Sequence, residues 1–164
     1  MNTLKKRPLS PTKIDIPYAI AENVTPVDKD FVKPSVHAFL VCDSVIQDMR
    51  TRKMSVIGIF AEMRATTFPC HHAAMGLYFC LSDALGTYEF EISLVNMDHD
   101  QRLGKAMLPP VKVEDRLKIV DVGVMMPPLV FPFPGRYEFR VSAHGHFVAR
   151  KDFNVVQVQP QLGV

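Results

Sequence analysis

The chain has 164 residues, of which 48% are hydrophobic; it contains 13 prolines and no tryptophan, and its formal net charge is +2. This length allows one domain with a real core, and the composition favours a β protein with strands bounded by loops over a helical bundle. Six basic and four acidic residues precede Ser35 and 13 of each sign follow it, so the domain lacks the continuous basic face of a nucleic-acid-binding protein.

The three cysteines, Cys42, Cys70 and Cys80, are an odd number without the spacing of a disulfide framework, which favours a reducing compartment. The basic residues 5–7 are followed by prolines and charges instead of an apolar stretch, so no export signal is predicted. No run approaches the roughly 18 apolar residues of a membrane-spanning helix. We therefore expect a soluble cytoplasmic protein without membrane contact.

Residues 1–34 hold five of the 13 prolines, much of the charge and no sustained periodicity. Such a composition buries too little apolar surface to offset the entropy that is lost on ordering. The segment is therefore predicted to be a flexible N-terminal arm. Ser10-Pro11 within it is a candidate docking element, although the composition favours a solvated tail.

The next part of the chain predicts two hairpins. Apolar runs at residues 36–46 and 55–61 flank a polar, basic tip and predict the first, and the continuity of these runs indicates strands covered on both faces. Residues 73–83 and 87–96 predict the second, because aromatic and aliphatic side chains alternate with polar ones in residues 87–96.

The C-terminal part predicts short strands separated by loops. In chain order these are an acidic loop at residues 97–102, a strand at 105–113 interrupted by Pro109-Pro110, a strand at 117–124, a proline-rich link at 126–135, and a hairpin at 136–158 that turns at His144-Gly145. In the first strand of this hairpin Tyr137, Phe139 and Val141 alternate with Glu138, Arg140 and Ser142, a period of two that predicts an apolar face on the core and a charged face in water.

Seven or eight short strands with turns between them predict an all-β fold, a two-sheet antiparallel β-sandwich with an immunoglobulin-like layout. The predicted organisation is the flexible arm at residues 1–34, the sandwich domain at 35–158 and a C-terminal tail at 159–164.

Four short motifs carry a resemblance: Cys42-Asp43, Ser55-Val56-Ile57-Gly58-Ile59-Phe60, Phe68-Pro69 and Pro134-Gly135-Arg136-Tyr137-Glu138-Phe139-Arg140-Val141. With them, the stretch from about residue 35 to 158 resembles a widespread bacterial family of small β-sandwich domains with no assigned function. Arg52-Lys53 at the first hairpin tip departs in part from the Asp or Gly with Lys that is usual in the family. The resemblance implies the sandwich fold and a bacterial origin, and it implies no catalytic residues.

One sequence cluster combines residue types that bind metals, namely Cys70-His71-His72 with Cys80. A zinc site would need four such groups to converge. Adjacent histidines in an extended chain point to opposite sides, and Cys80 lies in an apolar strand, where cysteine packs as a small hydrophobe. We therefore expect structural roles and no metal.

The acidic loop offers two carboxylates and an imidazole, on Asp98, His99 and Asp100. These groups suit acid–base chemistry or a hard cation, but turns collect aspartate for backbone reasons alone and no calcium-loop pattern follows.

Asp43 interrupts an apolar strand and is expected to accept backbone hydrogen bonds. His144 and His146 are expected to be solvated turn residues.

The proline-rich link at 126–135 carries the predicted contact surface. Its prolines remove backbone donors and hold the segment extended, so no regular ladder is expected there. Leu129, Phe131 and Phe133 are candidates for the centre of a protein-contacting or self-association surface, because an exposed aromatic on a stiff loop loses little entropy on binding. The alternative is that both phenylalanines plug the end of the core.

No nucleophile elbow, phosphate-binding glycine loop, zinc-protease motif or dinucleotide fingerprint occurs in the sequence. The sequence predicts a non-enzymatic binding or protein-interaction module without a cofactor. Its partner would be an unknown protein or a second copy, with no nucleic acid and no membrane. The alternative is a small metal-dependent or ligand-binding enzyme that uses the Cys70 to Cys80 region and the Asp98 to Asp100 loop.

Overall fold

A computed structural model describes residues 31–159, which contain thirteen strands and no helix. The strands are β1 (Ser35–Gln47), β2 (Met54–Ile59), β3 (Glu62–Ala65), β4 (Cys70–His72), β5 (Met75–Ser82), β6 (Gly86–Tyr88), β7 (Phe90–Asn96), β8 (Gln101–Met107), β9 (Val111–Val113), β10 (Val120–Met126), β11 (Leu129–Phe131), β12 (Gly135–Ala143) and β13 (His146–Gln157).

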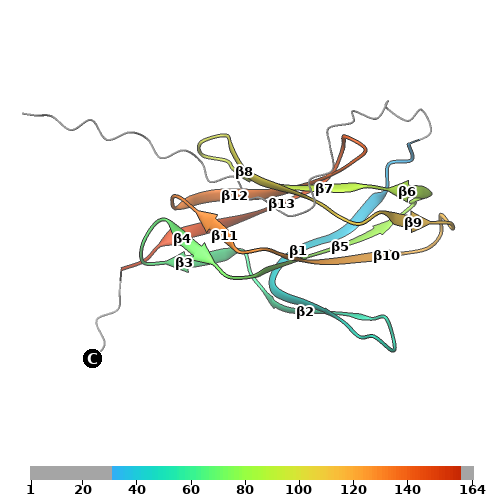
Figure 1. Ribbon diagram of the computed structural model, residues 1–164, viewed down its shortest axis with the longest axis horizontal. Helices are drawn as coiled ribbons and strands as arrows, with labels where there is room; N and C mark the ends of the chain where they lie inside the picture. The colour runs from blue at the N-terminus through green and yellow to red at the C-terminus, as the bar shows by residue number, and fades with distance from the viewer. Residues whose placement is uncertain (1–30, 160–164) are drawn as a thin grey trace, which may run out of the picture.

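Two stacked sheets form a sandwich (Figure 1). Sheet A has the strand order β10-β5-β1-β2, and sheet B has the order β3-β13-β12-β7-β8. The two-stranded ladders β11–β4 and β6–β9 lie at opposite ends of the sandwich. The predicted all-β, immunoglobulin-like, two-sheet fold is confirmed, and the pairs within the two sheets are antiparallel apart from β3, which runs parallel to β13.

The described residues contain more strands than the seven or eight expected, because several predicted segments are divided. The segment 87–96 becomes β6 and β7, which belong to different sheets. The proline-rich link contributes β11, although no ladder was expected there: β11 pairs with β4 from Leu129↔His72 to Phe131↔Cys70. Three residues are enough for this short ladder, since the prolines lie outside it.

The first and the C-terminal hairpins form as predicted, whereas the second does not. The turn of the C-terminal hairpin has positive φ at His144 (48°) and Gly145 (79°). β5 pairs with β1 and β10, whereas β7 pairs with β12 and β8. The turn residues between β5 and β7 therefore carry the chain from sheet A to sheet B instead of closing a hairpin.

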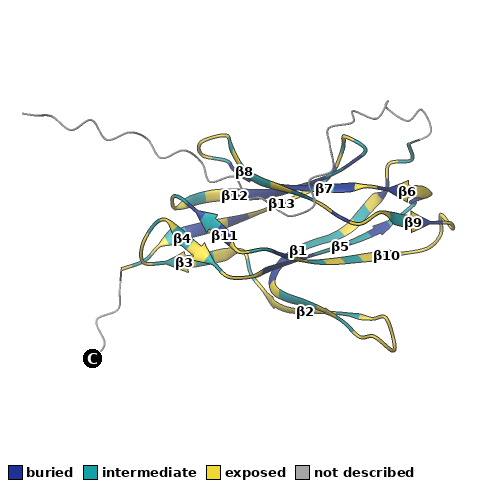
Figure 2. Cartoon of the chain, in the orientation of Figure 1, coloured by how far each residue is buried: buried dark blue, intermediate teal, exposed yellow. Residues whose placement is uncertain are grey.

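The core lies between the sheets, and Figure 2 shows which segments are buried. It is rich in aromatic rings. Phe79 of sheet A meets Phe90 of sheet B edge to face, with ring centroids 5.5 Å apart. Phe153 stacks on Phe139 at 5.5 Å. Such pairs add to the hydrophobic burial that holds the two layers together.

The base of the first hairpin covers part of the outer face of sheet A. Glycines leave room for it: a Cβ added at Gly76 would lie 2.8 Å from the Cys42 sulfur, and one at Gly123 would collide with Val45. Cys42 is consequently buried although it points away from the core. β1 is therefore covered on both faces only around Cys42 to Val45, and not along its whole length as expected.

Residues 1–30 of the predicted arm and residues 160–164 lie outside the described part of the chain. The arm's last residues lie against the sandwich, where Phe31 stacks on His146 at 4.5 Å and the Tyr88 hydroxyl donates to the Val32 carbonyl at 2.7 Å. His146 is therefore partly covered rather than fully solvated, and His144 Nε2 lies 2.8 Å from the Thr87 carbonyl. Within residues 31–159 no helix is long and apolar enough to cross a membrane.

Candidate functional site

The structure separates the three residues predicted to form a contact surface. Leu129 is 3% exposed and Phe131 is 0% exposed, whereas Phe133 is 49% exposed. The first two therefore belong to the core, and the expectation that Leu129 or Phe131 lies at the centre of an exposed surface is corrected. Sequence alone placed all three on one loop, but pairing of β11 with β4 turns Leu129 and Phe131 toward the core.

Phe131 plugs this end of the sandwich. Its ring meets Tyr137 edge to face at 5.0 Å and Phe153 at 5.9 Å. The alternative prediction, that both phenylalanines plug the end of the core, is therefore correct for Phe131 and wrong for the half-exposed Phe133.

Phe133 is exposed but firmly held. The hydroxyl of buried Tyr137 donates to the Phe133 carbonyl at 2.6 Å, and the ring of His99 stacks on the Phe133 ring at 5.2 Å. Burial raises the pKa of Tyr137, so its hydroxyl keeps the proton that it donates. A half-exposed aromatic ring is thus fixed at the end of the molecule.

A shallow groove with a volume of about 500 Å³ includes in its lining Pro134, the residue that follows Phe133 in the chain. It is lined by Asp98, Pro134, Gly135, Arg136, Asn154, Val155, Val156 and Gln157. Gly135 has φ of 149°, and a Cβ there would collide with the Asp98 carboxylate. Because this glycine leaves space, Asp98 can accept a hydrogen bond from the Arg136 backbone N–H at 3.0 Å, which closes one wall of the groove.

The acidic loop is organised by its own backbone. Asn96 Oδ1 accepts hydrogen bonds from the backbone N–H groups of Asp98 (2.9 Å) and His99 (3.1 Å), and Asp100 takes a positive φ of 47°. Within residues 31–159 no three His, Cys, Asp or Glu side chains come close enough together to hold a metal ion. The loop thus supplies a wall of the groove through Asp98 and a stacking partner for Phe133 through His99.

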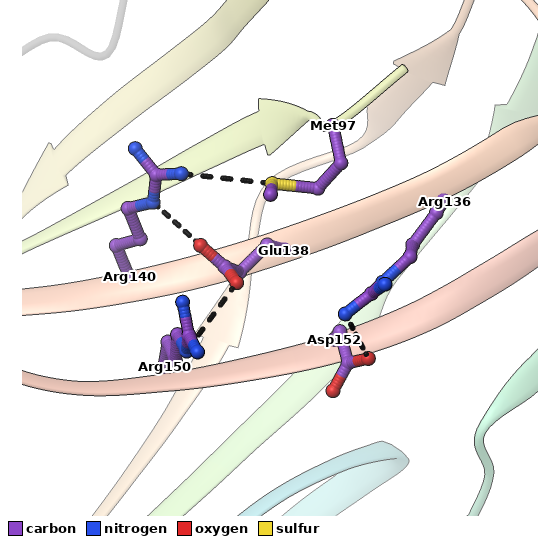
Figure 3. A network of polar contacts seen from close by, with 6 residues as sticks. All are labelled: Met97, Arg136, Glu138, Arg140, Arg150 and Asp152. Carbon is purple, nitrogen blue, oxygen red and sulfur yellow. Dashed lines mark hydrogen bonds and ion pairs between the residues drawn. The ribbon is translucent and has the colours of Figure 1, made fainter. Parts of the chain in front are cut away.

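Ion pairs lie on the outer face of sheet B (Figure 3), and Arg136 belongs both to them and to the lining of the groove. Glu138 is only 1% exposed, although its neighbours in β12 alternate between core and solvent. Its carboxylate lies 2.6 Å from Arg140 Nε and 3.7 Å from Arg150 Nε. Arg136, which lines the groove, pairs with Asp152 at 3.1 Å. Period-two reasoning placed Glu138 in water and missed this network, since no signal in the sequence marks a carboxylate covered by its neighbours.

The cysteine and histidine cluster is distributed over separate ladders. Cys70 and His72 lie in β4, whereas Cys80 lies in β5 beside Asp121 of β10. Burial raises the pKa of both thiols, which disfavours the thiolate that a nucleophile or a zinc ligand needs.

Asp43 lies against Gly58 of the neighbouring strand. No hydrogen bond from a backbone N–H to its carboxylate is found in the described residues, so the predicted backbone hydrogen bonds of Asp43 are not formed there.

Tyr78 offers a test of the outer face of sheet A. Its hydroxyl donates to Asp121 Oδ1 at 2.6 Å, and this hydrogen bond, with burial, raises the pKa of Tyr78 well above its ordinary value. The stabilisation is fully present below the unfolded-state value near pH 10 and is lost as pH rises through the folded-state pKa. We expect an alkaline spectrophotometric titration to show that Tyr78 ionises late, in addition to the buried Tyr137. The tyrosine signal is readable because the chain lacks tryptophan.

The matched variants for this titration are Tyr78→Phe, which should reduce the late phase by one tyrosine, and Asp121→Asn, which should shift the contribution of Tyr78 toward ordinary tyrosine. A contribution of Tyr78 to the late phase that is unchanged in Asp121→Asn would contradict the assigned cause.

Comparisons with known proteins add the following. No curated protein matches the chain. Among the solved structures that are similar to the chain is a Pseudomonas fluorescens alkylpurine DNA glycosylase bound to DNA with an abasic site analogue, with 11% identity and a TM-score of 0.47. Two others are an immunoglobulin-like protein from Pseudomonas aeruginosa, with 15% identity and a TM-score of 0.40, and a Listeria innocua β-glucosidase mutant in complex with laminaribiose, with 10% identity and a TM-score of 0.40.

These alignments cover 77%, 76% and 74% of this chain, and 31%, 98% and 16% of the respective structures. The chain therefore spans less than a third of the glycosylase. Identities and TM-scores this low carry no argument about function. A family model, by contrast, matches residues 37–156, which is most of the chain, and it describes a family of unknown function. The chain therefore belongs to the family of unknown function DUF6941.

Proposed function

We propose that the chain is a non-enzymatic protein-binding module of bacterial origin that acts in the cytoplasm and engages a partner protein at the end of the sandwich marked by Phe133. One observation carries this proposal: Phe133 is half exposed, yet its ring and its carbonyl are both fixed by neighbours. An aromatic ring that is ordered before binding loses little entropy when it is covered, and such rings dominate binding energies at protein interfaces.

The groove supports the same proposal. Its lining includes a backbone-bonded carboxylate, Asp98, which precedes the His99 that stacks on Phe133, and an arginine, Arg136. An apolar anchor with polar groups at its rim is the usual anatomy of a protein-binding surface. The cytoplasmic assignment draws support from the three cysteines, which are all free thiols, and the bacterial origin draws support from the family resemblance described above.

The enzyme alternative has no comparable support. The Cys70 to Cys80 region is divided between ladders, and Asp98 in the acidic loop bonds to backbone. The enzyme alternative therefore stays a prediction.

Photo-cross-linking tests the proposed surface. A photoreactive phenylalanine analogue at position 133 is expected to yield a specific cross-linked product in a lysate of the source organism, and mass spectrometry would identify its peptide. The matched control is the same analogue at Phe147, which is similarly exposed at 51%. Phe147 lies at the start of β13, next to the hairpin turn, whereas the groove is lined by residues at the end of β13. Irradiation of the purified protein alone would reveal self-association as a cross-linked dimer.

A product that forms equally from positions 133 and 147, or no product from position 133, would contradict the proposal. A partner that cross-links at position 133 must also fail to bind Phe133→Ala, because truncation removes the anchor while the fold is retained.

A further inference from the structure

The outer face of sheet B carries a row of side chains that crosses four strands. Lys105 of β8 lies opposite Ser93 of β7, Ser93 lies opposite Arg140 of β12, and Arg140 lies opposite Arg150 of β13. Residues that are directly opposite in register share one face of a sheet. Three cations and one small serine therefore lie side by side, and we call these four residues the cationic row.

Two of these cations are incompletely neutralised. Like charges directly opposite each other destabilise a strand pair, and Arg140 and Arg150 are such a pair. Glu138 offsets this with one buried carboxylate, which lies 2.6 Å from Arg140 and 3.7 Å from Arg150 (Figure 3). Both contacts use the Nε atoms. One negative charge thus positions two guanidinium groups and leaves a surplus positive charge beside it.

The other carboxylates of this face are already engaged. Glu91 pairs with Lys105 at 3.4 Å, and Asp152 pairs with Arg136 at 3.1 Å. Arg102 lies opposite Val95 and has no ion pair within the described residues. Cations outnumber carboxylates on the outer face of β8, β7, β12 and β13, the cations being Arg102, Lys105, Arg136, Arg140 and Arg150 and the carboxylates Glu91, Glu138 and Asp152.

We propose that the cationic row binds an acidic segment of the protein that docks at Phe133, an inference that rests on the proposed function. Arg136 and Asp152 connect the row with the groove. Arg136 lines the groove and pairs with Asp152. Asp152 lies opposite Glu138, whose carboxylate pairs with Arg140 and Arg150 of the row. The complementary charge of an acidic segment would neutralise the surplus positive charge that Arg140 and Arg150 keep while they share the single carboxylate of Glu138.

The spacing of the row suits an extended peptide. Neighbouring strands lie about 4.8 Å apart, so the four-strand row spans about 14 Å. An extended chain rises about 3.3 Å per residue, so acidic side chains at alternate positions over about five residues can reach the three cations. A nucleic-acid backbone fits this face less well, because Glu91 and Asp152 interrupt the positive charge that a continuous run of phosphates needs.

The probe for this inference is a fluorescein-labelled peptide of alternating Glu and Ser, with the matched Lys and Ser peptide as control. Fluorescence anisotropy with the full chain is expected to show binding of the Glu peptide only. This binding should weaken as salt is added, since the contacts are charged and partly exposed.

Two matched double variants locate the binding. Arg140→Gln with Arg150→Gln is expected to weaken binding of the Glu peptide about tenfold, as charge-assisted hydrogen bonds are lost. Arg50→Gln with Arg52→Gln removes the same charge from the tip of the β1–β2 hairpin, which Figure 1 shows projecting from sheet A away from sheet B. This control is expected to change binding less than about twofold, because the tip lies beyond the reach of the screened charges.

Glu138→Gln provides an independent test if the arginine variant is unstable. It keeps both guanidinium groups and removes the competing carboxylate, so the Glu peptide should bind at least as tightly as it binds the unmodified chain. Weaker binding to Glu138→Gln would overturn the inference.

Three further outcomes would also overturn it. These are no binding of the Glu peptide, an equal loss in the hairpin-tip control, and tighter binding of a single-stranded DNA of equal charge. The cross-linking at position 133 separates this inference from the proposed function. A specific product there with no binding of the Glu peptide would refute the acidic segment alone. Row-dependent peptide binding with no product at position 133 would refute the Phe133 surface alone.

Discussion

Phe131→Ala is expected to lower the free energy of unfolding by about 3–5 kcal/mol, the usual loss for a phenylalanine removed from a packed core. Phe131 is 0% exposed, and its ring touches Tyr137 and Phe153, so truncation opens a cavity at the end of the sandwich. Urea denaturation followed by circular dichroism measures this loss.

Phe133→Ala is the matched variant, since it removes the same side chain two positions away. Phe133 is half exposed, so the free energy of unfolding should change by less than about 1 kcal/mol. Equal losses in the two variants would mean that Phe133 is also a core residue, and the proposed contact surface would then be wrong.

Phe153→Ala is expected to have an effect of similar size, about 3–5 kcal/mol. Phe153 is 2% exposed, and its ring meets four other aromatic rings, those of Phe60, Phe131, Tyr137 and Phe139. Because these rings come from β11, β12 and the segment between β2 and β3, one truncation loosens several elements at once. The midpoint of thermal unfolding, measured by differential scanning calorimetry, should fall by roughly 10 °C or more.

Leu117→Ala is the control for this variant, since Leu117 is 88% exposed and its truncation should change stability by less than about 0.5 kcal/mol. A Phe153→Ala protein that melts within about 2 °C of the unmodified chain would show that the aromatic cluster contributes little to stability.

The fold could be predicted where side chains alternate. Tyr137, Phe139 and Val141 face the core as their period of two indicated. The second hairpin was wrong because turn residues such as Asp83 and Gly86, both at positive φ, reverse a chain within one sheet or carry it to the other sheet equally well. Local sequence does not distinguish these outcomes, because the partner of β7 is β12, far along the chain.

The candidate site was predictable only in part. Proline content identified the stiff link that holds Phe133, but the burial of Leu129 and Phe131 depends on β4, whose three residues show no strand periodicity of their own. Glu138 was assigned to solvent by alternation, and only the structure shows that two arginines cover it. The groove depends on Gly135 and Asp98, which lie far apart in sequence and meet only in the folded chain.

The parallel pairing of β3 with β13 bears on how the protein forms during synthesis. β3 finds its neighbour only when Asn154 to Gln157 are available to pair with Glu62 to Ala65, and β12, which pairs with β7 on one side, gains its second neighbour only with β13. The hairpin of β1 and β2 and its pairing with β5 require only early residues. A nascent chain on the ribosome can therefore assemble most of sheet A while sheet B still lacks β13, and pairings between such distant segments slow folding. During this interval the inner face of sheet A, with Phe79 and Leu77, is opposed only by β7 and β8 of sheet B, and this is the stage at which aggregation is expected.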